Sequence, residues 1–190
     1  HVAQDHGTWL HVDAAMAGER LIGMVQPKAH EEQTARPALS AVGCAGRITR
    51  YAETEDRRYL IILGGVVRFR IVHEIEAGTP YRQTAADYTP YLRDLGAAED
   101  DFDLPRDRLV AALKPYLGER KMKTDWDAIA SAPAENLINA LAIICPFEPA
   151  EKQALLEAPD LKERAHTLIT LLELANAAIA APPAGGRQVN

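Results

Sequence analysis

Cysteine is scarce in this sequence, and its scarcity excludes two classes of small domain. The two copies, Cys44 and Cys145, lie far apart, and neither has a second ligand at the spacing of a zinc site. Two thiols are also too few for the network of bridges that stabilises a small secreted domain. We therefore expect no disulfide framework and no structural zinc, and we expect a reducing cytoplasm as the compartment.

Long apolar runs and an excess of positive charge are also missing. No apolar run approaches the ~20 residues of a membrane-spanning helix, and the first residues lack the basic and apolar segments of a signal peptide. The net charge of -6 argues against nucleic acid, because phosphate binding draws its affinity from clustered lysine and arginine. We expect neither a membrane nor a nucleic acid as the default partner.

The motifs of catalysis and cofactor binding are absent as well. No GxxxxGKS or GxxxxGKT loop is present to bind phosphates. The two serines, Ser40 and Ser131, have no activating lysine nearby in sequence, and Ser131 is better explained as a helix cap. His73 and His166 lack a second ligand at a workable spacing, and the acidic residues 99–103 lack the period of a calcium loop. We expect no catalytic residue, no cofactor and no metal.

The segment that organises the chain is residues 42–76, which is the densest in β-forming residues. Residues 47–51 alternate polar and apolar, and residues 59–63 form an unbroken apolar run. Residues 67–71 alternate apolar side chains with arginines, so the two kinds of side chain fall on opposite faces of a strand. These patterns predict two or three strands of an antiparallel sheet or a small barrel.

Turn residues predict where the strands end. The acidic corner at residues 53–56 and the Gly64-Gly65 pair are the predicted breaks, because glycine supplies the positive φ of a tight hairpin or bulge. The expected flanking elements are a helix over residues 9–17, a strand over residues 20–25, a surface loop over residues 28–37, and an edge strand over residues 81–88 that ends before Pro90.

The hydrophobic period changes from two to about 3.6 in the C-terminal half, which predicts helices. Leu109, Val110, Leu113 and Leu117 form one apolar stripe behind Pro105, a good first helical residue. The other predicted helix starts are Thr124 acting with Asp127 as a cap, Pro133, the pair Glu148-Pro149, and a capping box of Asp160 with Glu163.

These elements together predict an α+β chain with two subdomains. We expect a small antiparallel β-barrel at about residues 18–92 and an α-helical bundle at about residues 103–181. The expected boundaries are a barrel subdomain at residues 1–96, an acidic hinge at 97–103, a helical subdomain at 104–181 and a flexible tail at 182–190.

Three stretches of the sequence resemble one known family. They are VGCAGRITRYAETEDRRYLIILGGVVRFRIV at residues 42–72, GERLIGMVQP at residues 18–27, and PFEPAEKQALLEAPDLKERAHTLITLLE at residues 146–173. They cover most of residues 18–175 and resemble the Lon N-terminal substrate-binding domain, a PUA-like barrel followed by a helical bundle. The resemblance implies a module that engages exposed apolar or unfolded client segments, without the ATPase and Ser-Lys peptidase modules of a full Lon protease.

The beginning of the chain departs from the family pattern. Residues 1–11 match neither the proline-punctuated first strand nor the acidic-aromatic turn with which family members open. A barrel that lacks a strand exposes unpaired backbone groups along an edge, and such an edge invites a second molecule. We therefore expect a homodimer completed through this edge, unless residues 1–11 of a monomer already occupy it.

The binding surface is expected among aromatic and arginine side chains of the barrel, because these bury much area per ordered rotamer. The candidate residues are Tyr51, Tyr59, Arg68, Arg70, Tyr81, Arg82, Tyr88 and Tyr91. The alternative is that the tyrosines are half-buried and that the arginines form ion pairs with Glu74 or Glu76. The prediction therefore is that these residues together mark the binding surface, not that each of them contacts a client.

Three functions remain open on the sequence. The favoured one is a non-enzymatic module that binds client polypeptides, an accessory in proteolysis or protein quality control. RNA binding is the alternative, since related barrel folds bind RNA and arginines concentrate in the barrel segment, namely Arg47, Arg50, Arg57, Arg58, Arg68 and Arg70. An enzyme would need convergent titratable groups in a pocket, and the sequence offers none that can be named.

Overall fold

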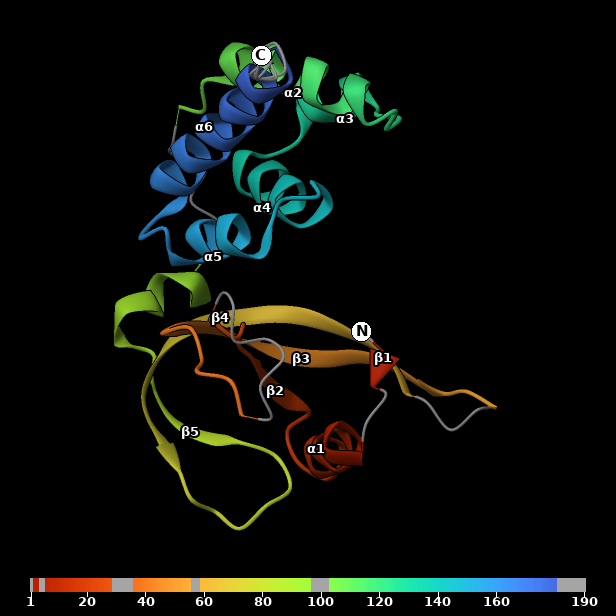
Figure 1. Cartoon of the computed structure of the whole chain (residues 1–190), viewed down its shortest axis with the longest axis vertical. Coiled ribbons are helices and arrows are strands. Elements are labelled where there is room, and N and C mark those ends of the chain that lie inside the picture. Colours follow the sequence, from red (N-terminus) through yellow and green to blue (C-terminus); the bar gives the residue numbers. More distant parts are fainter. Residues whose placement is uncertain (1, 4–5, 29–35, 56–58, 97–102, 181–190) are drawn as a thin grey trace, which may run out of the picture. The chain divides into compact units, whose positions relative to one another are not determined.

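The computed structural model describes residues 2–3, 6–28, 36–55, 59–96 and 103–180 (Figure 1). The chain divides into two compact units, His1–Ala97 and Ala98–Asn190. The first unit combines a sheet with helices and the second is helical, so the chain is α+β as predicted. Among the described residues, no helix combines the length and the apolar character needed to cross a membrane.

An antiparallel sheet forms the first unit, and its centre is a long hairpin of β3 (Val42–Glu53) and β4 (Tyr59–Ile75). β2 (Leu21–Met24) pairs with β3, and both β1 (Val2–Ala3) and β5 (Gln83–Asp87) pair with β4. The described strands follow the order β1-β4-β3-β2, with β5 also on β4, and no described pairing joins the ends of this path. The antiparallel sheet is confirmed, but it is open over the described residues rather than a closed barrel.

β4 continues through the Gly64-Gly65 pair, so the predicted break at these glycines is wrong. The ladder pairs Ala45 with Val67 and then Gly46 with Gly65, which leaves one extra residue on β4 between them. This register shift is a β-bulge, and a bulge lets a strand bend and twist without ending. The glycines therefore mark an irregularity inside one strand.

A small apolar core attaches the first helix, α1 (His6–Ala17), to the sheet. Val12 and Ala15 of α1 are buried against Ile22, Ile48 and Ile61, one from each of three neighbouring strands. The predicted helix over residues 9–17 is thus confirmed, with a start three residues earlier than its pattern indicated.

A 3-10 helix that the sequence analysis did not predict follows the edge strand. β5 confirms the predicted strand in a shorter form, and η1 (Thr89–Leu95) begins directly after it with Pro90 in its first turn. Proline fits there because a helix start needs no N–H donor. η1 packs against β4 and buries Tyr91.

The second unit consists of α2 (Arg106–Glu119), α3 (Trp126–Ser131), α4 (Ala134–Ile144), α5 (Pro149–Glu157) and α6 (Leu161–Ala180). Its core is one apolar cluster to which α2, α4, α5 and α6 contribute fully buried or nearly buried side chains. Leu109, Leu113 and Leu117 of the predicted stripe are buried there, while Val110 packs at the margin. The helical period of the sequence therefore identifies the core-facing side of α2.

The predicted helix starts at Glu148-Pro149 and at Asp160 with Glu163 hold, and α4 begins at Ala134, directly after Pro133. α2 begins at Arg106, so Pro105 is its cap residue rather than its first helical residue. The Asp160 carboxylate accepts the Glu163 N–H at 2.8 Å, and α5 has a full capping box between Glu148 and Glu151. The cap of α3 is Asp125 rather than Thr124, because the carboxylate of Asp125 accepts from the N–H groups of Asp127 and Ala128, the second and third residues of the helix.

Gly43 is expected to tolerate no side chain. A Cβ at this position would lie 2.7 Å from the Met24 carbonyl oxygen and 2.8 Å from the Phe69 ring, and backbone oxygen cannot move aside cheaply. Gly43→Ala should lower the free energy of unfolding by about 1–3 kcal/mol. Gly118→Ala is the control, since its Cβ would meet no atom within 4 Å, and alanine should gain about 0.5–1 kcal/mol in helix α2. Urea denaturation of both variants measures the difference, and equal stability would contradict the geometry.

Candidate functional site

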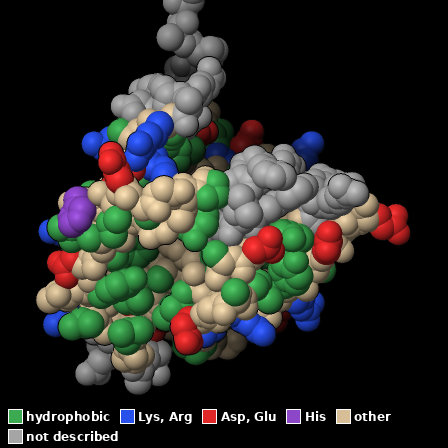
Figure 2. All heavy atoms as spheres, turned by 90° about the horizontal axis from the view of Figure 1, so that it is seen from below, with side chains coloured by type: hydrophobic (Ala, Val, Ile, Leu, Met, Phe, Trp, Pro, Cys, Tyr) green, Lys and Arg blue, Asp and Glu red, His purple; other side chains and the backbone are tan. Residues whose placement is uncertain are grey.

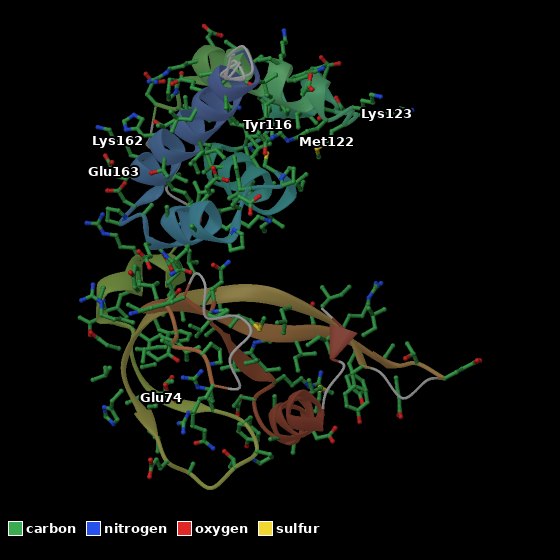
Figure 3. The ribbon with its side chains drawn as sticks, in the orientation of Figure 1. Glu74, Tyr116, Met122, Lys123, Lys162 and Glu163 are labelled. Atoms are coloured by element: carbon green, nitrogen blue, oxygen red, sulfur yellow. The ribbon has the colours of Figure 1, made fainter. Side chains whose placement is uncertain are left out.

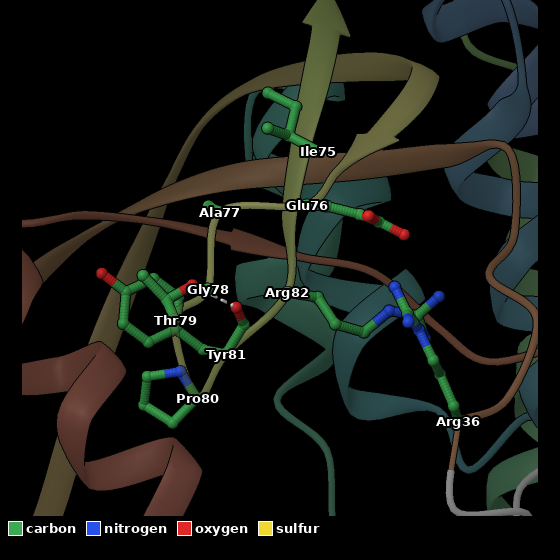
Figure 4. Close-up of a pocket in the computed structure, with 9 residues that line it drawn as sticks. All are labelled: Arg36, Ile75, Glu76, Ala77, Gly78, Thr79, Pro80, Tyr81 and Arg82. Atoms are coloured by element: carbon green, nitrogen blue, oxygen red, sulfur yellow. Dashed lines mark hydrogen bonds between the residues drawn. The ribbon is translucent and has the colours of Figure 1, made fainter.

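The turn between β4 and β5 forms a pocket of about 260 Å³ on the first unit. Its lining residues are Arg36, Ile75, Glu76, Ala77, Gly78, Thr79, Pro80, Tyr81 and Arg82 (Figure 4). Gly78 has a φ of 63°, a left-handed conformation that glycine adopts without a steric cost. The Thr79 hydroxyl donates to the Tyr81 carbonyl at 2.7 Å, so the turn that shapes the pocket is held by its own hydrogen bond.

Two arginines share one carboxylate beside this pocket. Arg82 donates through both Nε and a terminal nitrogen to Glu74, with the Nε contact at 3.0 Å, and Arg36 donates to the same carboxylate at 3.1 Å. Arg82 also donates to the Pro37 carbonyl, which ties the segment at Pro37 to the hairpin. Figure 3 labels Glu74 on the ribbon of the first unit. We call this set, Arg36, Glu74 and Arg82, the arginine clamp.

The clamp changes the acidity of its carboxyl group. Hydrogen bonds from Arg82 and then from Arg36 lower the pKa of Glu74 from 4.5 to about 2. The carboxylate therefore stays ionised at any physiological pH, and the two guanidinium groups stay oriented toward it. The clamp is a permanent feature of this surface rather than a switch near neutral pH.

The pocket offers both apolar and charged contacts. The Ile75 side chain is 44% exposed and Tyr81 is half-buried, while the guanidinium groups of Arg36 and Arg82 lie together on the opposite side (Figure 4). Figure 2 shows hydrophobic side chains gathered in patches among charged ones on the face seen from below. Such mixed surfaces suit polypeptide ligands, which present apolar side chains beside a polar backbone.

The chemistry of the pocket supports binding rather than reaction. Its lining contains no histidine or cysteine, and the Thr79 hydroxyl is already engaged with the backbone. Within the described parts of the chain, no group of three or more histidine, cysteine, aspartate or glutamate side chains could hold a metal ion. No nucleophile with a neighbouring base lines this pocket.

The predicted site residues lie in three separate places, and two of them, Tyr81 and Arg82, line the pocket. Tyr51 and Tyr59 lie near the other end of the β3–β4 hairpin, with ring centroids 5.0 Å apart. The hydrogen bond with Tyr51 raises the pKa of Tyr59 above its ordinary value, and burial and the Asp13 carboxylate act in the same direction. The tyrosine pair is therefore a local structure of its own.

Arg68 and Tyr91 are buried, with 5% and 6% of their surface exposed, so the expectation that they lie on the surface is wrong. Asp94 of η1 accepts from Nε and a terminal nitrogen of Arg68 at 2.8 Å each, and from the Arg68 backbone N–H at 3.0 Å. The guanidinium also lies 4.4 Å from the centre of the Tyr91 ring. This triad attaches η1 to β4.

The remaining two candidates lie where β5 leads into η1. Tyr88 is 39% exposed and packs against the Phe69 ring, with centroids 5.9 Å apart. Arg70 is exposed and lies opposite Asp87 in the ladder. Both side chains are accessible, but they lie with the Arg68 triad on β4 and η1 rather than in the lining of the pocket.

Sequence reasoning missed Arg36 and Ile75 as contributors to the site, whereas an ion pair of a candidate arginine with Glu74 is the alternative that it left open. A local signal existed for Glu74, because it precedes the turn at Gly78 by about as many residues as Arg82 follows it, and opposite charges flanking a turn can meet across the hairpin. Arg36 is 38 positions from Glu74 and carried no local signal. Ile75 was assigned to the strand pattern alone.

Two of the arginines invoked for RNA binding have other partners in the structure, namely Arg47 and Arg68. Arg68 is neutralised by Asp94 in the protein interior. Arg47 donates to the Glu19 carbonyl at 2.9 Å. Arg57 and Arg58 lie outside the described residues. RNA binding through a shared face of six arginines therefore has no support from Arg68.

The Arg68–Asp94 pair should matter more to stability than a surface pair of the same geometry. Asp94→Asn removes this counter-charge from beside the buried guanidinium, and we expect a loss of about 2–4 kcal/mol in the free energy of unfolding. Glu173→Gln is the matched control, since Glu173 binds Arg108 through two contacts of 2.7 and 2.8 Å but both side chains are exposed. It should cost at most about 1 kcal/mol. Similar losses in the two variants would contradict the assignment.

The clamp predicts a pH dependence of stability. Because the folded-state pKa of Glu74 lies below 4.5, its contribution is fully present above pH 4.5 and is lost as the pH falls toward 2. The Glu74→Gln variant should therefore have a lower melting temperature than the native chain at pH 7. This difference in melting temperature should shrink between pH 4.5 and 2. Glu76→Gln, in the same pocket, leaves the clamp intact and is the control. A difference in melting temperature that stays constant over this range would refute the prediction.

Comparison with known proteins places this geometry in a family. Residues 10–173 match the family model described as the ATP-dependent protease La (LON) substrate-binding domain. Over 168 residues the chain is 27% identical to Lon protease 2 of Myxococcus xanthus, a match that covers 83% of this chain and 19% of that protein. The chain thus spans about a fifth of the length of this relative.

Two solved structures are similar in fold. The N-terminal domain of the Mycobacterium avium complex Lon protease has a TM-score of 0.59 at 17% identity, covering 91% of this chain and 90% of that one. A Lon N-terminal domain protein from Xanthomonas campestris has a TM-score of 0.57 at 16% identity, covering 90% and 86%. Since the family model spans most of the sequence, this chain belongs to the Lon substrate-binding domain family.

Proposed function

We propose that this chain is a non-enzymatic module that binds client polypeptides for proteolysis or protein quality control. The membership in a family described as substrate-binding supports this function, and so does the similarity to a Lon protease. A full protease needs further machinery, whereas the residues that line the pocket supply contacts only. The module would select polypeptides, and a partner would degrade them.

The observation that carries the proposal is the composition of the pocket between β4 and β5. An exposed isoleucine and a tyrosine lie across from two guanidinium groups held in fixed positions by Glu74. Unfolded clients present apolar side chains next to free carbonyl groups. Arg36, whose side chain is 65% exposed, can donate to such a carbonyl while Ile75 and Tyr81 contact the side chain.

The accessible residues of the predicted set extend this surface. We propose Tyr81 and Arg82 as pocket contacts, and Tyr51, Tyr59, Arg70 and Tyr88 as outer contacts of a long client. Arg68 and Tyr91 act instead as supports, because they fix η1 to β4 from the interior. We also propose that residues 1–96 and 104–181 act as two subdomains joined through residues 97–103.

The pocket can be tested with a permanently unfolded protein. Fluorescein-labelled reduced and carboxymethylated α-lactalbumin should bind the native chain at micromolar concentration in an anisotropy titration. Ile75→Ser should weaken this binding by about tenfold, because a buried isoleucine contributes roughly 1.5 kcal/mol. Ile179→Ser is the matched control on α6, since Ile75 and Ile179 are exposed to similar extents, 44% and 47%.

Two results would count against the proposal. Absence of binding to the native chain at tens of micromolar would remove the function itself. Equal losses of affinity in the Ile75→Ser and Ile179→Ser variants would leave polypeptide binding supported but would show that the pocket is not where the client binds.

A further inference from the structure

The two edges of β4 are covered unequally. β3 pairs with β4 from Tyr59 to Arg70 along one edge. Arg70 pairs with β5 as well as with β3, and Leu60 pairs with β1 as well as with β3. β1 and β5 therefore lie on the same edge, opposite β3, with β1 at the beginning of β4 and β5 near its end (Figure 1). Between them, no strand within the described residues covers this edge of β4.

The uncovered part of the edge has defined ends. At one end, the Arg68 N–H is taken by the Asp94 carboxylate, so η1 closes the edge there. At the other end, Val2 pairs with Leu60. Residues 62–67 remain between these points, a stretch of roughly 20 Å at about 3.3 Å per residue. We call residues 62–67 the open edge of β4.

The side chains around the open edge favour pairing with another strand. Natural sheet edges are protected by lysine, proline, inward-pointing charge or a β-bulge. The sequence of the open edge, ILGGVV, contains none of the first three, and the bulge after Gly65 lies within it. Gly64 and Gly65 present no side chain to an approaching backbone. Leu60 and Ile62 are exposed at 50% and 49%, whereas Ile61 between them is 5% exposed, so both point away from the core.

We propose that the open edge of β4 binds an extended, apolar segment of a client polypeptide as an added strand. The inference rests on the proposed function and names the conformation in which the client is held. Backbone pairing supplies affinity that is independent of sequence, and alternate side chains of the guest can pack beside Leu60 and Ile62. This fits a module whose clients share an unfolded state rather than a motif.

The geometry favours a client over a second copy of the chain. The open edge lies recessed between β1 and β5, so the open edges of two copies cannot reach each other in one plane. Among the described strands, the outer edges of β2 and β5 belong to strands of four and five residues, both shorter than the open edge. The occupant must itself be an extended segment with a free edge, as in an unfolded polypeptide.

Backbone-methylated peptides test the pairing directly. The probe is a fluorescent peptide of alternating valine and threonine between two lysines. It is compared with one version N-methylated at every second residue, which leaves one edge able to pair, and one N-methylated at every residue, which leaves none. We expect the unmodified peptide and the half-methylated version to bind, and the fully methylated version to bind at least tenfold more weakly. Hydrogen exchange of the outward N–H groups in residues 62–67 should slow on binding.

Two substitutions on the same strand give the matched controls. Ile62→Ser removes an exposed side chain beside the open edge and should weaken the binding of the peptide several-fold. Val72→Ser removes a side chain that is 63% exposed on β4 outside the open edge, and should leave the affinity unchanged. Both residues are on the surface, so both variants should fold.

The outcomes separate this inference from the proposed function. If the fully methylated peptide binds as tightly as the parent peptide, or exchange in residues 62–67 does not slow, edge pairing is overturned while binding of unfolded α-lactalbumin stands. If the α-lactalbumin titration fails, the proposed function falls regardless of the peptide. Protection of residues 62–67 in the free monomer, or protection that accompanies a doubling of mass in light scattering, would show the edge filled by the chain itself or by a second copy, and would overturn the proposal.

Discussion

The pairing of β3 with β4 is the interaction on which the first unit depends. β4 is 17 residues long, and every feature considered for function is attached to it. The tyrosine pair lies at its beginning, the open edge and Arg68 lie along its middle, and the pocket follows its end. The ladder continues along a strand of this length although its register shifts at two points, because a bulge lets a strand bend and twist without ending.

The burial of Arg68 shows how charge is used inside this unit. A buried guanidinium is costly unless its donors are satisfied, and here one carboxylate accepts from two of its nitrogens while an aromatic ring lies against it. The pair gives η1 a single position on β4, since any shift of the helix would separate Asp94 from Arg68. The arginine clamp at Glu74 works differently, because it lies at the surface and orients donors that a ligand can use.

Sequence patterns predicted what depends on local periodicity. The stripe of Leu109, Leu113 and Leu117 follows directly from the helical period, and the resemblance to the family was confirmed by the match over residues 10–173. Partners distant in sequence could not be predicted in the same way. Asp94 lies 26 residues from Arg68, so nothing near the arginine indicated that it would be buried rather than exposed.

The Gly64-Gly65 pair shows a second limit of prediction from the sequence, and this limit bears on function. Glycine is equally compatible with a turn and with a bulge, and the choice depends on whether the neighbouring strand continues beside it, which is a property of the ladder. Because β3 does continue, Gly64 and Gly65 lie inside β4. The same residues that made the turn prediction wrong therefore belong to the edge at which we propose that a guest strand pairs. A sheet that holds a guest in this way needs no chemistry at the site, since the guest supplies half of each hydrogen bond.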